Sequence, residues 1–273
     1  MDDTIAVKDL CFRYIKNDIL RNISFSIPKG SICGLLGPNG SGKTTLLKCI
    51  NGLRTPYKGN VFINGSSVYK MSRENVSRLI SMVPQQSNIV FPYTVLDMVL
   101  LGKSASLGWT KMPSSEDQEK ASELLEHLEL SHLKNRCVNE LSGGEKQMVM
   151  IARALFQNTG IILLDEPTAH LDFKNAYMVL DKVKNISEEN NLTTLITLHD
   201  PNLAGYYCSK LIMLKDGQLI FNGSSDDGFK AKKLSRLYSM DICIENTSRG
   251  VKMALPAFST KTTSVHCAAH NMQ

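Results

Sequence analysis

The first part of the chain has a strand-like pattern of hydrophobic and polar positions. Apolar and polar residues alternate in short blocks over residues 5–30, which predicts β-strands. A buried strand is expected at 31–36, and it runs directly into a glycine-rich segment. A helix is expected over 44–51. A strand, a glycine-rich loop and a helix in this order form the context that a phosphate-binding loop requires.

The middle of the chain has a helical pattern instead. Helices are expected over 95–101 and 116–130, and in the second of these the leucines 124, 125 and 128 share one face. The stretch 102–115 between them is punctuated by Gly, Ser and Pro. We therefore interpret residues 87–155 as a helical subdomain inserted into an α/β core.

Strand and helix patterns alternate again after residue 166, which predicts a mostly parallel sheet and an α/β fold class. The expected elements are a helix at 173–190, a strand at 193–197, a helix at 201–208, a strand at 211–214 and a hairpin at 216–217. An earlier strand pair is expected over 58–69, around Asn64-Gly65.

The end of the chain carries weaker structural signals. We interpret 241–256 as a C-terminal extension and 257–273 as a frayed, disordered tail, because the tail is polar, small and aperiodic. His266, Cys267 and His270 fall in this tail. A flexible tail offers no surrounding groups to orient metal ligands, so no metal site is expected there.

Composition narrows the class of protein. A chain of 273 residues with 42% hydrophobic and 21% charged residues is ordinary for a globular protein. It has no run of eighteen apolar residues and no signal-peptide pattern, so we expect a cytoplasmic protein. The net charge of +5 comes without a basic run, so no nucleic-acid partner is expected. The seven cysteines are scattered and predict reduced thiols.

The glycine-rich segment has the pattern G-x-x-x-x-G-K-T at residues 37–44, here called the phosphate loop. Its backbone N–H groups and the following helix N-terminus suit an anion. We expect Lys43 to reach the β- and γ-phosphates of a nucleotide and the Thr44 hydroxyl to ligate Mg²⁺. The nucleotide-binding set predicted here is Gly37, Pro38, Asn39, Gly40, Ser41, Gly42, Lys43, Thr44 and Thr45.

Two more motifs follow in a fixed order. Residues 141–147 read Leu-Ser-Gly-Gly-Glu-Lys-Gln, here called the signature loop, with Ser142 expected as a helix N-cap. Residues 161–166 form an apolar strand that ends in Asp165 and Glu166. With the phosphate loop, these motifs resemble those of the ATP-binding-cassette (ABC) ATPase family, and the resemblance covers about residues 4–240.

The resemblance implies a P-loop NTPase fold with a RecA-like core sheet, an N-terminal antiparallel β subdomain and the inserted helical subdomain. It also implies that ATP and Mg²⁺ are the cofactors. Asp165 is then the magnesium-binding carboxylate, Glu166 polarises the attacking water, and His199 contacts the γ-phosphate. Gln85 contacts Mg²⁺ and the water, although the adjacent Gln86 is an alternative.

The resemblance further implies a homodimer with ATP between two subunits. Ser142, Gly143 and Gly144 then face the nucleotide of the second subunit, and Asp172 crosses the interface. Tyr14 matches the aromatic residue that stacks on adenine, with Phe12 as the competing choice.

Within the family the chain resembles the ATPase subunits of metal-chelate importers, for iron-siderophore, haem or cobalamin, through residues 91–103 and 107–108. This implies integral permease partners, a solute-binding protein and a peripheral place on the cytoplasmic face of the cell membrane. Apolar residues expected at an exposed permease-docking surface are Phe91, Tyr93, Val95 and Leu96. The alternatives are another transporter class or a non-transport ATPase of translation or DNA repair, but residues 44–141 contain no sustained heptads.

Overall fold

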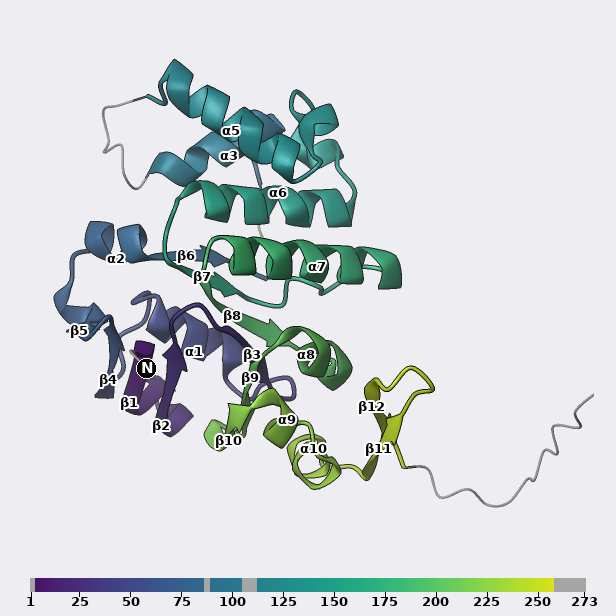
Figure 1. Cartoon of the computed structure of the whole chain (residues 1–273). Coiled ribbons are helices and arrows are strands. Elements are labelled where there is room, and N and C mark those ends of the chain that lie inside the picture. Colours follow the sequence, from purple (N-terminus) through teal and green to yellow (C-terminus); the bar gives the residue numbers. More distant parts are fainter. Residues whose placement is uncertain (1–2, 86–88, 105–111, 258–273) are drawn as a thin grey trace, which may run out of the picture.

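The computed structural model describes residues 3–85, 89–104 and 112–257. At its centre is a six-stranded sheet in the order β10-β9-β3-β8-β7-β6, in which β10 alone runs antiparallel to its neighbour. Three of its strands, β3, β7 and β8, are buried along their whole length because helices cover both faces of the sheet (Figure 1). The strands are β3 (Ile32–Leu36), β6 (Ile80–Val83), β7 (Ile161–Leu164), β8 (Thr193–Leu198), β9 (Lys210–Lys215) and β10 (Gln218–Ser224).

A second, antiparallel sheet lies beside this core in the order β2-β1-β4-β5. Side chains of this sheet, of helix α1 and of one face of the central sheet share a hydrophobic cluster. The helix α1 that follows the phosphate loop is therefore held between the two sheets. The elements are β1 (Asp3–Tyr14), β2 (Asn17–Pro28), α1 (Lys43–Ile50), β4 (Lys58–Ile63), β5 (Ser66–Ser67) and, after a short 3₁₀ turn, α2 (Arg73–Leu79).

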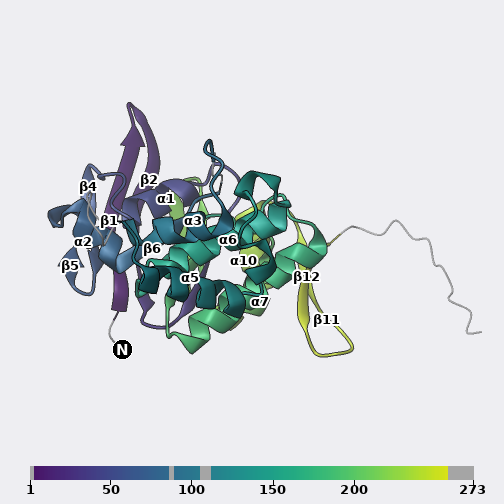
Figure 2. The ribbon, with the colours of Figure 1, turned by 90° about the horizontal axis from the view of Figure 1, so that it is seen from above.

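Helices form the opposite end of the molecule (Figures 1 and 2). Helix α6 packs against α3, α5 and α7, and so joins the inserted helices to the core sheet. Each of three helices begins at a capping box, in which a Ser or Thr hydroxyl accepts the N3 amide and an acidic side chain accepts the cap amide. The elements are α3 (Val95–Leu100), α5 (Ser115–His127), α6 (Gly143–Phe156) and α7 (Phe173–Glu189).

The C-terminal part wraps around the edge of the core and ends in a two-stranded hairpin. The sequence interpretation treated residues 241–256 only as an extension. The elements are α8 (Pro201–Tyr207), α9 (Ser225–Gly228), α10 (Ala231–Tyr238), β11 (Ile242–Asn246) and β12 (Lys252–Pro256). Among the described residues, no helix is both long and apolar enough to cross a bilayer.

The fold class expected from the sequence is confirmed. One expectation within the helical part is wrong: Val95 is completely buried rather than exposed. It is the first residue of α3, and its side chain belongs to the hydrophobic cluster around α6. The expectations for Gln86, residues 107–108 and the tail 258–273 lie outside the described residues.

Candidate functional site

An open hollow of about 710 Å³ lies at the carboxyl ends of the parallel strands. Loops that follow strands far apart in the sequence meet there, as the topology of a parallel sheet requires. The lining residues are Ile19, Asn39, Gly40, Gly42, Lys43, Thr44, Thr45, Gln85, Glu166, Ala169, His170 and His199. The hollow therefore brings together most of the residues predicted to handle the phosphates.

The phosphate loop is shaped as a cradle for an anion. Gly40 and Gly42 have φ of 77° and 103°, which L side chains rarely adopt. A Cβ at Gly37 would lie 2.3 Å from the Leu214 carbonyl oxygen, so only glycine fits. The Ser41 hydroxyl is buried and has no hydrogen-bond partner among the described residues. Buried polar atoms are normally paired, so an unpaired hydroxyl inside this loop fits a phosphate ligand.

Lys43 lies at the floor of the hollow and is almost completely buried. Its Nζ donates to the carbonyl oxygens of Gly37 at 2.9 Å and Pro38 at 3.3 Å. Burial lowers the pKa of Lys43, and the nearby carboxylates of Glu166 and Asp165 offset part of this effect. Within the loop, the buried Lys43 ammonium contacts neutral carbonyl oxygens, so it can bind a negatively charged phosphate oxygen in their place.

Side chains from separate segments converge on the carboxylate of Glu166. Its Oε1 lies 2.7 Å from His199 Nε2 and 3.6 Å from Lys43 Nζ. Its Oε2 accepts from Gln85 Nε2 at 2.5 Å. The residue itself has φ of 51°, an uncommon and strained value for a glutamate. The three residues predicted to be catalytic, Glu166, His199 and Gln85, are thus in direct contact.

Asp165 lies beneath this group with only 1% of its surface exposed. Its Oδ1 accepts from the hydroxyls of Thr44 and Thr197, each at 3.1 Å. Burial raises the pKa of Asp165, and these two hydrogen bonds act in the opposite direction. A buried carboxylate without a full counter-charge, in contact with a threonine hydroxyl, is a suitable ligand set for Mg²⁺. Thr44 and Asp165 therefore fit the metal role expected of them, and Gln85 contacts their neighbour Glu166.

Thr197 is a site residue that the sequence interpretation missed. It is completely buried in β8, and its hydroxyl also accepts from the Glu166 backbone N–H at 2.6 Å. Thr197 therefore fixes the position of both acidic residues. The only signal in the sequence was a polar residue in a buried strand two positions before His199, which is also usual for a β-branched strand former.

The remaining predicted residues are not among those that line this hollow. Tyr14 is the last residue of β1 and is 40% exposed, whereas Phe12 is 6% exposed. The two rings are in edge contact at 4.8 Å, and the Arg54 guanidinium lies 5.6 Å from the Tyr14 centroid. Of the two aromatic candidates, Tyr14 alone presents an accessible face for a base.

The signature loop and Asp172 form a second surface of their own. A Cβ at Gly143 would lie 3.7 Å from Leu171 Cδ2, and one at Gly144 would lie 3.0 Å from Asn175 Cγ. Asp172 caps α7 through the amide of Asn175 at 2.7 Å. None of Ser142, Gly143, Gly144 and Asp172 lines the hollow, so this surface is separate from it.

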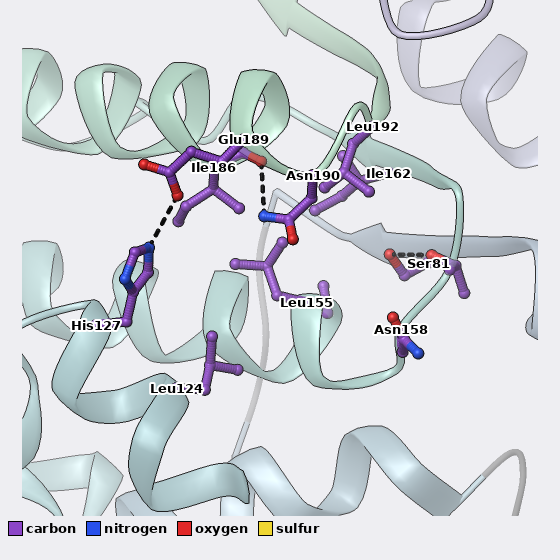
Figure 3. A pocket seen from close by; sticks show the side chains of 12 residues that line it. Ser81, Leu124, His127, Leu155, Asn158, Ile162, Ile186, Glu189, Asn190 and Leu192 are labelled. Carbon is purple, nitrogen blue, oxygen red and sulfur yellow. Dashed lines mark hydrogen bonds and ion pairs between the residues drawn. The ribbon is translucent and has the colours of Figure 1, made fainter.

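Another hollow lies between α5, α6 and α7, near the opposite ends of the strands (Figure 3). His127 Nε2 and Glu189 Oε2 face each other across its mouth at 3.1 Å. Lys182 Nζ and Glu129 Oε1 form a neighbouring pair at 2.8 Å. This hollow contains none of the predicted site residues, and the two ion pairs connect the inserted helical part to α7.

Comparison with protein families gives one match to the ABC transporter model, over residues 20–169. Among curated proteins, the chain is 40% identical to the "Probable iron chelatin transport ATP-binding protein" of Helicobacter pylori. That alignment covers 86% of this chain and 92% of the relative.

The chain is also similar to solved structures of ABC transporter proteins. The structure described as "An inward-facing conformation of a putative metal-chelate type ABC transporter" matches with a TM-score of 0.84 and 30% identity, covering 95% of this chain and 99% of that one. A dimeric bacterial ABC transporter cassette matches with a TM-score of 0.71 and 32% identity, covering 81% and 98% of the two chains.

Proposed function

The chain belongs to the ABC transporter ATPase family, whose members hydrolyse ATP, and we propose that it powers the import of a metal chelate through a membrane permease. The relatives named for iron chelatin and metal-chelate transport support this class of solute. We propose in addition that a solute-binding protein delivers it, and that this subunit sits on the cytoplasmic face of the membrane.

The observation that carries the proposal is the convergence of Lys43, Gln85 and His199 on Glu166. A carboxylate in this position can accept hydrogen bonds from an attacking water and orient it. His199 and Gln85 hold the two oxygens of the carboxylate, so its orientation is fixed before substrate binds. The site is therefore arranged for hydrolysis as well as for binding.

We propose that the phosphate loop binds the phosphates of ATP through its N–H groups, the Ser41 hydroxyl and Lys43. Thr44, Asp165 and Gln85 would hold Mg²⁺, and Tyr14 would stack on the adenine. Magnesium, when bound, neutralises charge on the phosphoryl oxygens during transfer to water. Asp165 and Glu166 divide the work: Asp165 is buried and serves the metal, whereas Glu166 faces the hollow and serves the water.

The hollow and the separate surface of the signature loop support a homodimer in which two copies pack head to tail. The signature loop presents the N-terminus of the 14-residue helix α6, with exposed Ser142 and Gly143 at its tip. Such an N-terminus attracts anions, yet it does not line the hollow of its own chain. In a two-fold dimer the signature loop of each copy, with Asp172 beside it, would complete the hollow of the other.

The test of hydrolysis is phosphate release by purified Glu166→Gln. This variant keeps the shape of the side chain and the amide can still contact His199 and Gln85, but it cannot act as a base. We expect phosphate release to fall about 10²–10⁴-fold while ATP affinity is retained. Glu188→Gln is the matched control, because Glu188 is exposed on α7. Near-normal hydrolysis by Glu166→Gln would show that another group positions the water.

A further inference from the structure

The Tyr14 side chain lies at the tip of a projecting hairpin. Tyr14 ends β1 and pairs with Asn17 across the turn to β2. Figure 2 shows this hairpin extending beyond the elements around it. Ile19, two residues further along β2 than Asn17, lines the nucleotide hollow. The tip of the hairpin therefore adjoins the hollow, as a residue that stacks on a base requires.

Two neighbouring side chains hold the Tyr14 ring. Phe12 is buried in the hydrophobic cluster of the antiparallel sheet, and its ring meets that of Tyr14 in edge contact, with the planes at 82°. The Arg54 guanidinium lies over the Tyr14 ring, 5.6 Å from its centroid. The face of an aromatic ring attracts a cation, and a planar guanidinium can also stack on it. The ring is thus supported on a tip where it would otherwise turn freely.

Arg54 has a fixed backbone and a side chain with no competing polar contact. The residue is exposed, and its guanidinium forms no hydrogen bond or ion pair with any residue that the structure describes. The Arg54 amide donates to the Lys48 carbonyl at 3.1 Å, in a turn that closes α1 at Gly52, where φ is 65°. The helix that begins at Lys43 of the phosphate loop therefore ends in the turn that carries Arg54.

We propose that Arg54 is a positioning residue for the base of the nucleotide, because it holds the Tyr14 ring in the orientation that receives adenine. The inference deepens the proposed function, since it rests on the stacking of adenine on Tyr14. The guanidinium takes one face of the ring, so the base is directed to the other. Arg54 acts through the ring and therefore contributes to binding of the base, whereas the phosphates are bound by the phosphate loop.

A second pair of the same kind lies at the same hairpin and provides a matched control. The Arg13 guanidinium lies 4.7 Å from the centroid of the Tyr57 ring, and the Tyr57 hydroxyl donates to Asp18 at 3.2 Å. Arg13 is adjacent to Tyr14 in β1 but lies over a different ring. Arg13→Ala therefore removes the same charge and the same type of contact from the hairpin tip, and leaves the contact of Arg54 with Tyr14 in place.

The test is isothermal titration of the full chain with MgADP and with magnesium pyrophosphate, which lacks the base. Arg54→Ala should weaken ADP binding about two- to fivefold, as expected for the loss of an exposed cation–π contact, and leave pyrophosphate binding unchanged. Arg54→Lys keeps the cation and should retain most of the ADP affinity, and Arg13→Ala should match the wild type. In steady-state ATPase assays, Arg54→Ala should raise KM and not lower kcat.

A double-mutant cycle shows whether Arg54 acts through the ring. In the Tyr14→Ala background, Arg54→Ala should have no further effect on ADP affinity. The proposal is overturned if Arg54→Ala still weakens ADP binding in that background, if it weakens pyrophosphate binding equally, or if it behaves like Arg13→Ala. Tighter ADP binding by Arg54→Ala would also overturn it, because Arg54 would then compete with the base for the ring. If Tyr14→Ala alone leaves ADP affinity unchanged, it is the proposed stacking on Tyr14 that is wrong.

Discussion

Thr197 connects the two acidic residues of the site, and its role can be tested directly. Thr197→Val keeps the β-branched shape in β8 but leaves the Glu166 N–H without its acceptor and Asp165 without one of its two donors. We expect a loss of about 1–3 kcal/mol in unfolding free energy, the usual cost of an unsatisfied buried group. We also expect a lower kcat with little change in KM, because Glu166 loses its support. Denaturant unfolding and steady-state ATPase assays measure both.

Thr193→Val is the control for losing a hydroxyl elsewhere in the same strand. Thr193 is also buried in β8, and its hydroxyl accepts from the Gly30 amide at 3.1 Å, away from the two acidic residues. Thr193→Val should lower the free energy of unfolding, but its kcat per folded molecule should stay unchanged. If Thr197→Val keeps a normal kcat, the Thr197 hydroxyl has only a structural role.

The buried carboxylate of Asp165 is expected to lower the stability of the folded protein, although its proposed role is to bind Mg²⁺. Burial raises its pKa above the ordinary value, so the folded state disfavours the charged form. The resulting destabilisation is complete above the folded pKa and disappears as the pH falls below the unfolded pKa. Asp165→Asn should therefore raise the free energy of unfolding at pH 7–8 by about 0.5–2 kcal/mol, as measured by denaturant unfolding. This gain in stability should vanish in acid. A variant that is less stable at pH 8 would contradict this account.

Single residues differ in how far the sequence reveals them. The phosphate loop and the pair Asp165-Glu166 were predictable, because their chemistry depends on neighbours in the chain. The family resemblance implied that Gln85, Glu166 and His199 act at one nucleotide, but not that Glu166 contacts the other two, which lie far from it in the sequence. Thr197 was missed because a threonine in a strand has an ordinary explanation.

At the scale of elements, the helix starts were accessible from sequence because caps are local. The Ser142 hydroxyl accepts from the Glu145 amide at the start of α6, as expected. The hairpin β11–β12 was not anticipated, because its short strands are stabilised by Asn202, about fifty residues earlier. Val95 was placed wrongly because an apolar residue next to a loop gives no sign of which way it faces.

The segment before α3 supplies the prediction for permease docking. Phe91 is 63% exposed and its ring lies 5.9 Å from that of Tyr93, which with Leu96 is only partly buried. A charge at this surface, in Phe91→Glu or Leu96→Asp, should abolish capture by the cognate permease in a pull-down. ATP affinity should stay unchanged because α1, which follows the phosphate loop, packs in a different hydrophobic cluster.

Leu53→Glu serves as the control for docking, since Leu53 is 49% exposed after α1, far along the chain from the helical insertion. If permease capture and ATP affinity fall together, the segment is structural core. If neither falls, docking lies on another surface.

At the scale of the whole molecule, the central claim is that one ATP is held by two copies of the chain. In the proposed dimer, each copy has a phosphate-loop half-site in the hollow and a signature-loop half-site at the start of α6, outside the hollow. The α/β fold class was predictable from the alternation of strands and helices. The need for a second copy was visible only through the resemblance, and the structure supports it because Ser142, Gly143 and Gly144 do not line the hollow.

Gly143→Asp tests this claim without disturbing the monomer. A Cβ at Gly143 meets only Leu171 Cδ2 at 3.7 Å, and an aspartate in the first turn of α6 is favourable for the helix. In the dimer the same carboxylate would repel the phosphates held by the other copy. Gly160→Asp is the matched control, because nothing lies within 4 Å of a Cβ there.

The decisive measurement is sedimentation velocity of these variants in the Glu166→Gln background, with and without MgATP. We predict that Glu166→Gln and its Gly160→Asp derivative shift towards dimer on addition of MgATP. The Gly143→Asp derivative should bind ATP with unchanged affinity but show no such shift. An equal MgATP-dependent shift in the Gly143→Asp derivative would contradict the account, because the signature loop would then take no part in holding the nucleotide.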